Sequence, residues 1–274
     1  MIINGVTTDF VNANDRGLMY GDGVFRTLLL QQGKLILWSD HYKKLQQDCT
    51  SLGLACPTMT TLSTELDQLI AQQSDGVIRI TITRGTGARG YAPPIQPQVT
   101  RILNLSPLPS YLTAYAISGV KVHLCNLRLA HQPRLAGVKH LNRLENVLAA
   151  AECQTAECQP GEIAEGLLLD TADNLVEGTR SNLFLIKNGT LYTPDLSLCG
   201  VAGLQRERVM NWATQHDVEC KITNLKIEDL LAADEVFLVN SVIGLWPVRE
   251  IAGLKRENFP ISLTIQDWLN HGLR

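Results

Sequence analysis

The chain has 274 residues, of which 45% are hydrophobic and 19% charged, and its formal net charge is -3 at pH 7. This length and apolar content suffice to bury a sizeable core in one large domain or two smaller ones, and we expect two. The small negative charge excludes a chain-wide basic surface for nucleic acid or an anionic membrane, and leaves only a local cluster of Arg and Lys to bind a small anion.

The cysteines and the first residues indicate the compartment. Seven cysteines, an odd number without CxxC pairs, indicate neither a disulfide framework nor a zinc or other metal site. Residues 1–5 are not a charged segment leading into an apolar stretch, and no run approaches the ~18 apolar residues of a membrane span. We expect a soluble cytoplasmic protein whose free thiols are Cys49, Cys56, Cys125, Cys153, Cys158, Cys199 and Cys220.

Ahead of the first predicted strand, residues 15–27 combine aromatic, glycine and charged residues in one loop. An elaborate turn closed by a structural ion pair is one interpretation of this loop. The other is a wall of an active site, in which Thr27 offers a hydroxyl group to a substrate.

A hairpin and a helix are predicted next. Residues 28–37 contain two short apolar runs around the turn residues 31–33, which is typical of a hairpin. A helix should follow, with Ser39 or Asp40 as its N-cap and Gly53 as its stop. The buried face of this helix is expected to contain Leu45, Cys49 and Leu52.

Strict alternation predicts a half-buried strand at residues 77–83, where isoleucine alternates with arginine or threonine. This strand runs into a glycine-rich loop, residues 84–91, which carries two arginines. Two prolines within residues 106–110 then break regular structure, and this segment is the best candidate for a linker between two domains. We predict a small N-terminal α/β domain at residues 1–106, an interdomain linker at 107–118 and a larger C-terminal domain at 119–274.

The C-terminal part mixes strands and helices without a regular βαβ rhythm. The α+β class therefore fits better than a doubly wound sheet. Strands are expected around residues 120–124, 166–170, 182–186 and 235–239, and helices after Lys139, after Gly203 and near the C-terminus.

Lys139 is the leading candidate for catalysis. Most lysines lie on the solvated surface, because an unpaired ammonium is costly to bury. Lys139 instead follows the small apolar segment 135–138, and desolvation there favours a neutral amine that acts as a nucleophile and proton shuttle. A helix is predicted after it, with an apolar stripe of Leu141, Leu144, Val147, Leu148 and Ala151.

Glu177 is a candidate partner for this lysine. It lies between a predicted hairpin tip at 170–174 and the strand that begins at Asn182, where a solvated loop glutamate is the ordinary interpretation. Gly178 beside it allows the backbone to approach a ligand closely. A lysine and such an acid are what pyridoxal phosphate requires, because the amine holds its aldehyde as a Schiff base and the acid keeps its ring nitrogen protonated.

Two further segments are candidate anion sites. Residues 200–206 place flexible glycines before a predicted helix, whose free N–H groups suit a phosphate, although any glycine-led helix looks similar. Asn240 and Ser241 follow an apolar strand and are a second possible donor set, or simply a turn.

These motifs, in this order, resemble the fold-type IV pyridoxal phosphate family of branched-chain aminotransferases, D-amino acid aminotransferases and aminodeoxychorismate lyases. The resemblance covers nearly the whole chain, from residues 20–25 through Lys139 and Glu177 to residues 234–236 and 247–248. Within the family, the segments most similar to the lyases are residues 21–27, 84–91, 135–145 and 239–241.

The resemblance implies a two-domain enzyme like D-amino acid aminotransferase, with pyridoxal 5'-phosphate as its cofactor. It implies a Schiff base at Lys139 and a contact from Glu177 to the pyridine nitrogen. The implied remaining cofactor contacts are Leu204, Gln205, Asn240, Ser241 and Lys44. Lys44 departs from the family, which usually has an arginine there, and supplies a point charge instead of a bidentate fork. Gln205 stands where the aminotransferases often have threonine, which removes a hydroxyl contact and leaves the backbone donors.

The implied reaction converts 4-amino-4-deoxychorismate to 4-aminobenzoate and pyruvate, a step of folate biosynthesis. Lys139 would remove the proton from the amine-bearing ring carbon, and expulsion of the enolpyruvyl group would leave an aromatic ring. Thr27 is expected to protonate or orient the leaving group, and the substrate carboxylates are expected to bind Arg89, Tyr91 and Asn240. The family is usually a homodimer with its site near the subunit boundary.

Other functions remain open from the sequence. A branched-chain or D-amino acid aminotransferase would use identical cofactor machinery, and Thr27, Asn240 and the Arg89 loop favour the lyase. A non-catalytic pyridoxal phosphate-binding protein of the same fold is the second alternative. Chance motif matches on an α+β domain would predict no cofactor at all.

Overall fold

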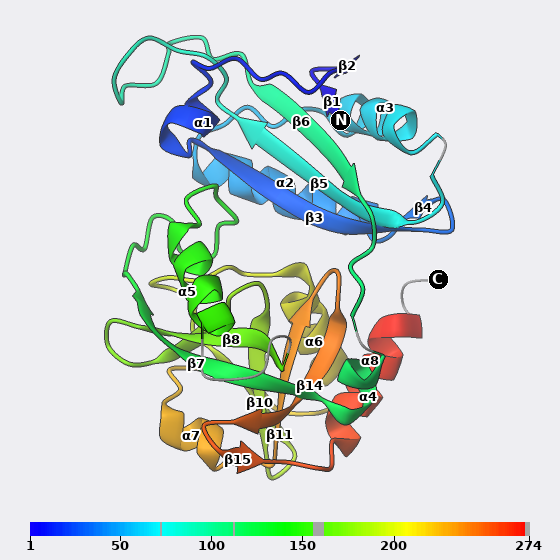
Figure 1. The fold of residues 1–274 in the computed structure, drawn as a ribbon, viewed down its shortest axis with the longest axis vertical. Coiled ribbons are helices and arrows are strands. Elements are labelled where there is room, and N and C mark those ends of the chain that lie inside the picture. Colours follow the sequence, from blue (N-terminus) through cyan, green and yellow to red (C-terminus); the bar gives the residue numbers. More distant parts are fainter. Residues whose placement is uncertain (72, 112, 156–161, 272–274) are drawn as a thin grey trace. The chain divides into compact units, whose positions relative to one another are not determined.

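The computed structural model describes residues 1–71, 73–111, 113–155 and 162–271. This part of the chain forms two compact units (Figure 1). Unit 1 consists of Met1–Pro109 and Val138–Asn142, and unit 2 consists of Ser110–Gly137 and Arg143–Arg274. The chain thus leaves unit 2 after Gly137, contributes a short segment to unit 1 and returns. The predicted division into consecutive stretches does not include this return, and helix α4 (Ala114–Ser118) occupies part of the predicted linker.

Unit 1 is built on a six-stranded antiparallel sheet in the order β2-β1-β6-β5-β3-β4. Helices α2 and α3 cover one face of it (Figure 1). The strands are β1 (Ile2–Ile3), β2 (Val6–Thr7), β3 (Gly23–Gln31), β4 (Lys34–Leu35), β5 (Gly76–Thr83) and β6 (Thr100–Ser106). The helices are α1 (Arg16–Tyr20), α2 (Trp38–Ser51) and α3 (Met59–Ile70).

Alternation along the strands decides which side chains face α2 and α3. The predicted strand at 77–83 is confirmed as β5, and its three isoleucines, Ile78, Ile80 and Ile82, are fully buried. Because successive side chains of a strand point to opposite faces, Arg79 and Thr81 lie on the other face of the sheet. Strand β3 begins earlier than expected, at Gly23, so Thr27 lies within a strand and not in a loop.

The predicted hairpin is confirmed, and the predicted cap of the next helix is wrong. Strands β3 and β4 pair around Gln32 and Gly33, whose positive φ angles of 50° and 74° suit a tight hairpin turn. Helix α2 starts directly after β4, with Leu37 at the N-cap and no side-chain cap, while Asp40 lies in its first turn.

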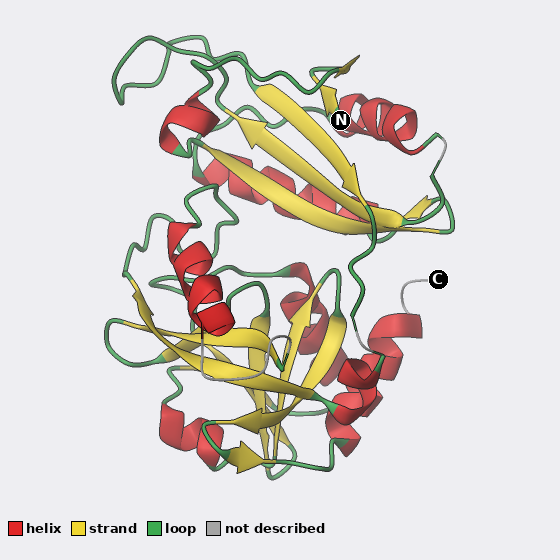
Figure 2. Cartoon of the chain, in the orientation of Figure 1, coloured by secondary structure: helices red, strands yellow, loops and turns green. Residues whose placement is uncertain are grey.

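Unit 2 contains a nine-stranded mixed sheet (Figure 2). Its path is β12-β11-β10-β13-β14-β7-β8-β9, and β9 also pairs with β10, which closes part of the sheet into a ring. The strands are β7 (Val120–Leu129), β8 (Ile163–Asp170), β9 (Leu175–Gly178), β10 (Asn182–Lys187), β11 (Thr190–Pro194), β12 (Cys220–Thr223), β13 (Glu235–Asn240), β14 (Gly244–Ile251) and β15 (Leu254–Lys255). The helices besides α4 are α5 (Leu144–Thr155), α6 (Leu204–Gln215), α7 (Ile227–Leu231) and α8 (Pro260–His271).

The core of unit 2 lies on both sides of its central strands. On β10, Leu183 and Leu185 pack with the side chains inside the ring, while Phe184 joins the cluster that includes residues of α6 and α8. Phe184 stacks on Phe237 of β13, its direct cross-strand neighbour, with ring centroids 5.0 Å apart. All four strands predicted for this part are confirmed, and the α+β class is confirmed with them.

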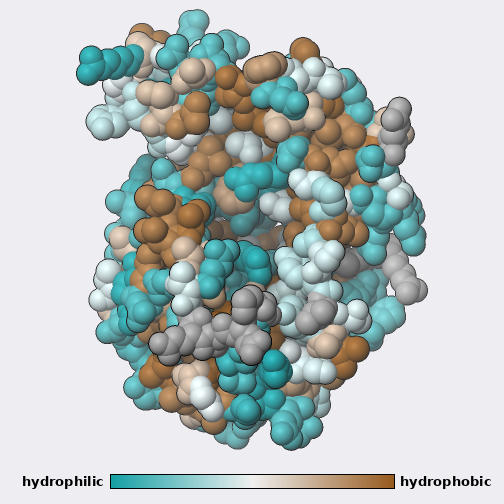
Figure 3. Space-filling view, viewed as in Figure 1, coloured by the Kyte–Doolittle hydropathy of each residue, from teal (hydrophilic) through white to brown (hydrophobic). Residues whose placement is uncertain are grey.

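Helix α5 differs from the expectation. It begins at Leu144, so Leu141 precedes it, and its apolar stripe does not pack in this chain. Leu144, Val147 and Leu148 are 68%, 61% and 51% exposed, and Figure 3 shows brown side chains gathered over this helix. Periodicity finds the stripe, and the structure shows that nothing in the described part of the chain covers it.

The structure tests the expectations about the cysteines and about membrane-spanning helices only for the residues that it describes. Of the cysteines, six are free thiols, and Cys158 lies outside the described residues. None of the helices within the described ranges has the length and apolar character needed to cross a membrane.

The start of α8 depends on a buried carboxylate from β13. Glu235 accepts hydrogen bonds from the N–H groups of Ile261 (3.0 Å) and Ser262 (2.8 Å) and from the Ser262 hydroxyl (2.6 Å). These donors lie in the first turn of the helix, where backbone N–H groups lack intrahelical acceptors.

We predict that Glu235→Ala lowers the free energy of unfolding by about 3 kcal/mol, because three donors at the start of α8 lose their acceptor. Urea unfolding followed by circular dichroism measures this change. Glu257→Ala removes a carboxylate from an exposed position and is the control, with an expected change below about 0.5 kcal/mol. Equal effects of the two substitutions would show that Glu235 does not hold α8.

Candidate functional site

The backbone around Lys139 is held by β3 of unit 1. The Phe25 N–H donates to the Lys139 carbonyl (2.9 Å), and the Leu141 N–H donates to the Gly23 carbonyl (3.0 Å). Val24 and His140 form the antiparallel bridge between them. Lys139 therefore lies on a short strand-like segment and not at the start of a helix.

A buried ion pair lies behind this segment. The Asp48 carboxylate on α2 contacts the Arg26 guanidinium at 2.5 Å, and its other oxygen accepts the Lys139 N–H at 3.4 Å. Burial raises the pKa of Asp48, and the charge of Arg26 opposes that rise. Both side chains are about 95% buried, and removal of either would leave an uncompensated charge in the core of unit 1.

The Lys139 amine lies over the open face of the sheet. Its Nζ is 4.7 Å from the centroid of the Phe25 ring, and the guanidinium carbon of Arg79 is 3.7 Å from the same centroid. Thr27 is half-buried and directly opposite Arg79 in the β3–β5 pairing, so it shares that face. Unit 1 thus brings together the amine of Lys139, the hydroxyl of Thr27 and the cation of Arg79.

Arg79 is a functional candidate that the sequence reasoning missed. In the sequence, Arg79 is one of the polar residues that alternate with isoleucine in the predicted strand, and this pattern indicates no function for it. Among the residues that the structure describes, no carboxylate pairs with its guanidinium. An arginine on an aromatic ring, on the same face as Lys139, is suited to bind a carboxylate of a ligand.

His41 and Lys44 lie on α2 with Asp48. His41 is 3% exposed, and burial, together with the charges of Arg26 and Lys139, lowers its pKa to about 3. Its imidazole is therefore neutral at any working pH. Lys44 is half-buried, and its carbonyl accepts a hydrogen bond from Arg26 (3.3 Å). The spacing of three and four residues puts all three α2 side chains on one side of the helix.

In unit 2, Glu177 holds a loop in place. Its carboxylate is 3% exposed on β9 and accepts the Val201 N–H at 2.8 Å. The ordinary interpretation of Glu177 as a solvated loop residue is therefore wrong. Val201 also forms a bridge with Gly137, two residues before Lys139 in the chain. Asn182 completes the arrangement, because its side chain donates to the Val201 carbonyl (2.7 Å) and accepts the Gly203 N–H (3.1 Å).

The same loop leads into α6. Gly203 is its N-cap, and glycine offers no side-chain acceptor to the first N–H groups of the helix. A Cβ at Gly203 would come within 2.2 Å of the Asn182 side-chain oxygen, so glycine is required there. Leu204 and Gln205 are both buried in the first turn. The Gln205 side-chain oxygen accepts a hydrogen bond from Arg208 (3.0 Å). Gln205 can therefore offer a ligand its backbone N–H group.

Asn240 closes the turn after β13. Its side-chain oxygen accepts the N–H groups of Val242 and Ile243, both at 2.8 Å, and its amide donates to the Arg180 carbonyl at 3.1 Å. The turn interpretation therefore holds for Asn240, which keeps one amide hydrogen for another acceptor. Ser241 is half-buried next to it.

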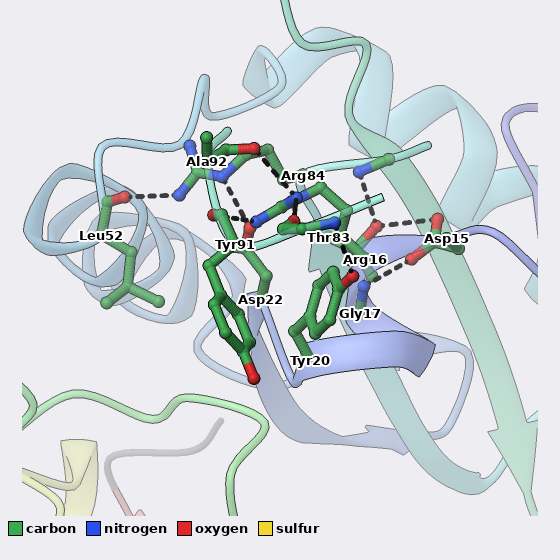
Figure 4. Close-up of polar contacts among 12 residues, drawn as sticks. Asp15, Arg16, Gly17, Tyr20, Asp22, Leu52, Thr83, Arg84, Tyr91 and Ala92 are labelled. Carbon is green, nitrogen blue, oxygen red and sulfur yellow. Dashed lines mark hydrogen bonds and ion pairs between the residues drawn. The ribbon is translucent and has the colours of Figure 1, made fainter. Parts of the chain in front are cut away.

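The loop after β5 is fixed by arginines other than Arg89 (Figure 4). Asp22 accepts a hydrogen bond from Arg16 and one from Arg84, both at 2.8 Å. Burial alone would raise the pKa of Asp22, but these two arginines hold it below its ordinary value of 3.8. The Arg16 guanidinium also donates to the carbonyls of Gly90, Tyr91 and Ala92.

The side chains of the predicted substrate-binding residues on this loop point into solvent. Arg89 is exposed, and Tyr91 is 85% exposed with its ring edge against Tyr20. The structural ion pair considered for residues 15–27 is therefore present as Arg16–Asp22. Arg89 and Tyr91 are thus exposed on this loop, whereas Lys139 lies over the Phe25 ring and Thr27 lies opposite Arg79 on the sheet.

Known proteins resemble this chain over nearly its full length. Residues 23–251 match the family model described as amino-transferase class IV. The chain is 36% identical over 263 residues to a Vibrio harveyi protein named aminodeoxychorismate lyase, with 95% of this chain and 94% of that protein covered.

Two solved structures also resemble this chain over nearly its full length. The crystal structure of 4-amino-4-deoxychorismate lyase from Pseudomonas aeruginosa has a TM-score of 0.91 and 41% identity, and the match covers 98% of each chain. The crystal structure of a branched-chain amino acid aminotransferase from Escherichia coli, at 22% identity, has a TM-score of 0.86 and covers 99% of this chain and 93% of its own. That second likeness shows the same fold.

We predict a pH dependence of stability from His41. Its pKa is about 3 in the folded state and 6.5 ordinarily, so below pH 6.5 the unfolded state binds a proton that the folded state excludes. Stability should therefore fall by up to ~1.4 kcal/mol per pH unit as the pH drops from 6.5 towards 3. Urea unfolding at several pH values should show a shallower fall for His41→Asn than for the wild type. Identical slopes would contradict a buried neutral imidazole.

Proposed function

The chain belongs to the amino-transferase class IV family, and from that membership we propose that it is a pyridoxal 5'-phosphate-dependent lyase, which converts 4-amino-4-deoxychorismate to 4-aminobenzoate and pyruvate. The observation that carries this proposal is the full-length similarity to two proteins named as lyases of that substrate. The reaction belongs to folate biosynthesis.

Residues of unit 2 fit parts of this cofactor. A cationic pyridine nitrogen suits the buried Glu177 carboxylate, which the Val201 N–H orients. A phosphate suits the start of α6, where Leu204 and Gln205 offer backbone N–H groups beside an N-cap without a side chain. Both groups belong to one loop and its helix, which supports a single ligand for them. We assign Ser241, Asn240 and Lys44 as further cofactor contacts.

When bound, pyridoxal phosphate supplies an aldehyde for amines and a ring that withdraws electrons from the attached carbon. Lys139 would hold the cofactor, and its amine, once freed by the amine of the substrate, would accept the proton of the amine-bearing ring carbon. The C–O bond to the enolpyruvyl group breaks as that proton leaves, and the ring becomes aromatic. The Thr27 hydroxyl, on the same face of the sheet as the amine, protonates or orients the leaving oxygen.

Two carboxylates of the substrate need cationic or polar partners. We add Arg79 to the expected set of Arg89, Tyr91 and Asn240, because it lies on the face that carries Lys139 and Thr27. The planar guanidinium of Arg79 offers a bidentate clamp, and the Phe25 ring holds it flat. Asn240 would donate to a substrate carboxylate with its second amide hydrogen, because the first one binds the Arg180 carbonyl.

We also propose a homodimer, as the family resemblance implies. The apolar stripe of α5 supports it, since Leu144, Val147 and Leu148 are adjacent on one helix face and exposed in the single chain. A second copy of the chain is the occupant that we assign to this stripe.

An aminotransferase of the same fold is the second candidate function, because the structural similarity extends to the Escherichia coli branched-chain enzyme. An aminotransferase requires an amino acceptor, whereas the lyase does not. A non-catalytic protein that binds the cofactor is the third candidate.

The lyase proposal predicts that the purified protein with pyridoxal phosphate releases 4-aminobenzoate and pyruvate from 4-amino-4-deoxychorismate without a 2-oxo acid. Both products are measured by chromatography. Lys139→Ala should reduce the rate by about a thousandfold or more, because it removes the proton acceptor. Turnover that requires a 2-oxo acid would indicate an aminotransferase, and cofactor binding with no turnover would indicate the non-catalytic protein.

Arg79→Gln is predicted to raise KM about tenfold with a smaller change in kcat, because it removes a charged partner of a bound carboxylate. Steady-state kinetics measures both constants. Arg249→Gln removes an exposed guanidinium and should leave both constants unchanged. An unchanged KM in Arg79→Gln would remove this residue from the substrate site.

A further inference from the structure

Three potential metal ligands of different chemistry meet in unit 2. They are His131 after β7, Asp170 at the end of β8 and Cys199 in the loop before α6, and their ligand atoms all lie within 4.8 Å of one another. The His131 Nε2 is 2.9 Å from an oxygen of Asp170. The residues are far apart in the sequence and form no recognisable motif, which is why the sequence predicts no metal site.

Backbone hydrogen bonds hold the three segments together without any ligand. The Gln132 N–H donates to the Leu198 carbonyl (2.8 Å), and the Thr171 N–H donates to the Leu129 carbonyl (3.2 Å). These bonds lie one or two residues from His131, Asp170 and Cys199. The donor set is therefore preorganised by the fold, which lowers the cost of binding an ion.

The Asp170 carboxylate is oriented by its own surroundings. It is 5% exposed and accepts hydrogen bonds from the N–H groups of Ala172 and Asn174 and from the Asn174 side chain. Such hydrogen bonds to a ligating carboxylate fix its direction in metal sites. His131 is 31% exposed, so solvent reaches the cluster from its side.

The charge around the thiol favours a cation. Cys199 is half-buried, and the carboxylates of Asp170, Glu177 and Glu145 surround its thiol. A divalent ion that displaces the thiol proton would be neutralised by one thiolate and one carboxylate.

We propose that His131, Asp170 and Cys199 form a Zn²⁺ site with solvent as the fourth ligand. Nitrogen, oxygen and sulfur donors match zinc, which binds them at about 2.0–2.3 Å in a tetrahedron. Such a tetrahedron separates its ligands by roughly 3–4 Å, and the three ligand atoms of the cluster lie within 4.8 Å of one another. On binding, the Cys199 S–H bond breaks, the S–Zn bond forms and the proton passes to solvent.

The site adjoins the loop that holds Glu177. Cys199 is followed by Gly200 and then by Val201, whose N–H group binds the Glu177 carboxylate. Zinc would therefore tie the start of this loop to the ends of β7 and β8. The binding of zinc does not rest on the proposed lyase activity.

Titration of the cofactor-loaded protein with Co²⁺ tests the site, because tetrahedral cobalt with a thiolate ligand gives visible bands at wavelengths longer than those of the cofactor. We expect such bands to saturate at one equivalent and to disappear when Zn²⁺ is added. Cys199→Ser and His131→Gln should each weaken Co²⁺ binding at least about tenfold. Cys220→Ser removes another half-buried thiol and should bind Co²⁺ as the wild type does.

The variants also separate this site from metal binding by the cofactor itself. His131 is exposed, so His131→Gln should keep the fold, which far-ultraviolet circular dichroism checks. The absence of saturable bands in the wild type would overturn the proposal. Equal Co²⁺ affinity in the wild type, Cys199→Ser and His131→Gln would overturn it as well, because the metal would then bind elsewhere.

Discussion

The antiparallel pairing of residues 138–142 with β3 is the constraint on which the arrangement of Lys139 depends. The stretches before and after this segment, Ser110–Gly137 and Arg143–Arg274, belong to unit 2, whereas the segment itself belongs to unit 1. Two backbone hydrogen bonds with Phe25 and Gly23 fix their register. Because register decides which way each side chain of a strand points, this pairing puts the Lys139 amine on the face of Phe25, Thr27 and Arg79.

A second set of contacts fixes the chain just before this segment. Gly137 pairs with Val201 in unit 2, and Val201 in turn holds the Glu177 carboxylate. The loop that orients Glu177 also carries Gly203, the N-cap of α6. The loop at residues 200–203 thus contacts the proposed partner of the pyridine nitrogen and leads into the proposed phosphate site at the start of α6. The proposed zinc site lies at the other end of that loop.

Local patterns in the sequence predicted the elements well and their partners poorly. Ile78, Ile80 and Ile82 alternate with polar residues, and this period alone specifies a strand with one buried face. The hairpin before α2 follows from its turn residues in the same way. No local pattern shows that residues 138–142 pair with β3, because that contact joins segments more than a hundred residues apart. The pair of Arg26 with Asp48 and the proximity of Arg79 to Lys139 also result from tertiary contacts, which no local pattern in the sequence shows. Helix α5 is a further example. Its periodicity predicts an apolar face but does not predict which residues cover that face.

The assignment of Lys139 as the cofactor lysine is the central claim, and borohydride reduction tests it most directly. Reduction of the cofactor-loaded protein would make the bond between lysine and cofactor permanent, and mass spectrometry of the digested protein would locate it. We predict that the added mass lies on the peptide that contains Lys139 and on no other peptide. Modification of a different lysine, such as Lys44, with Lys139 left unmodified would contradict it.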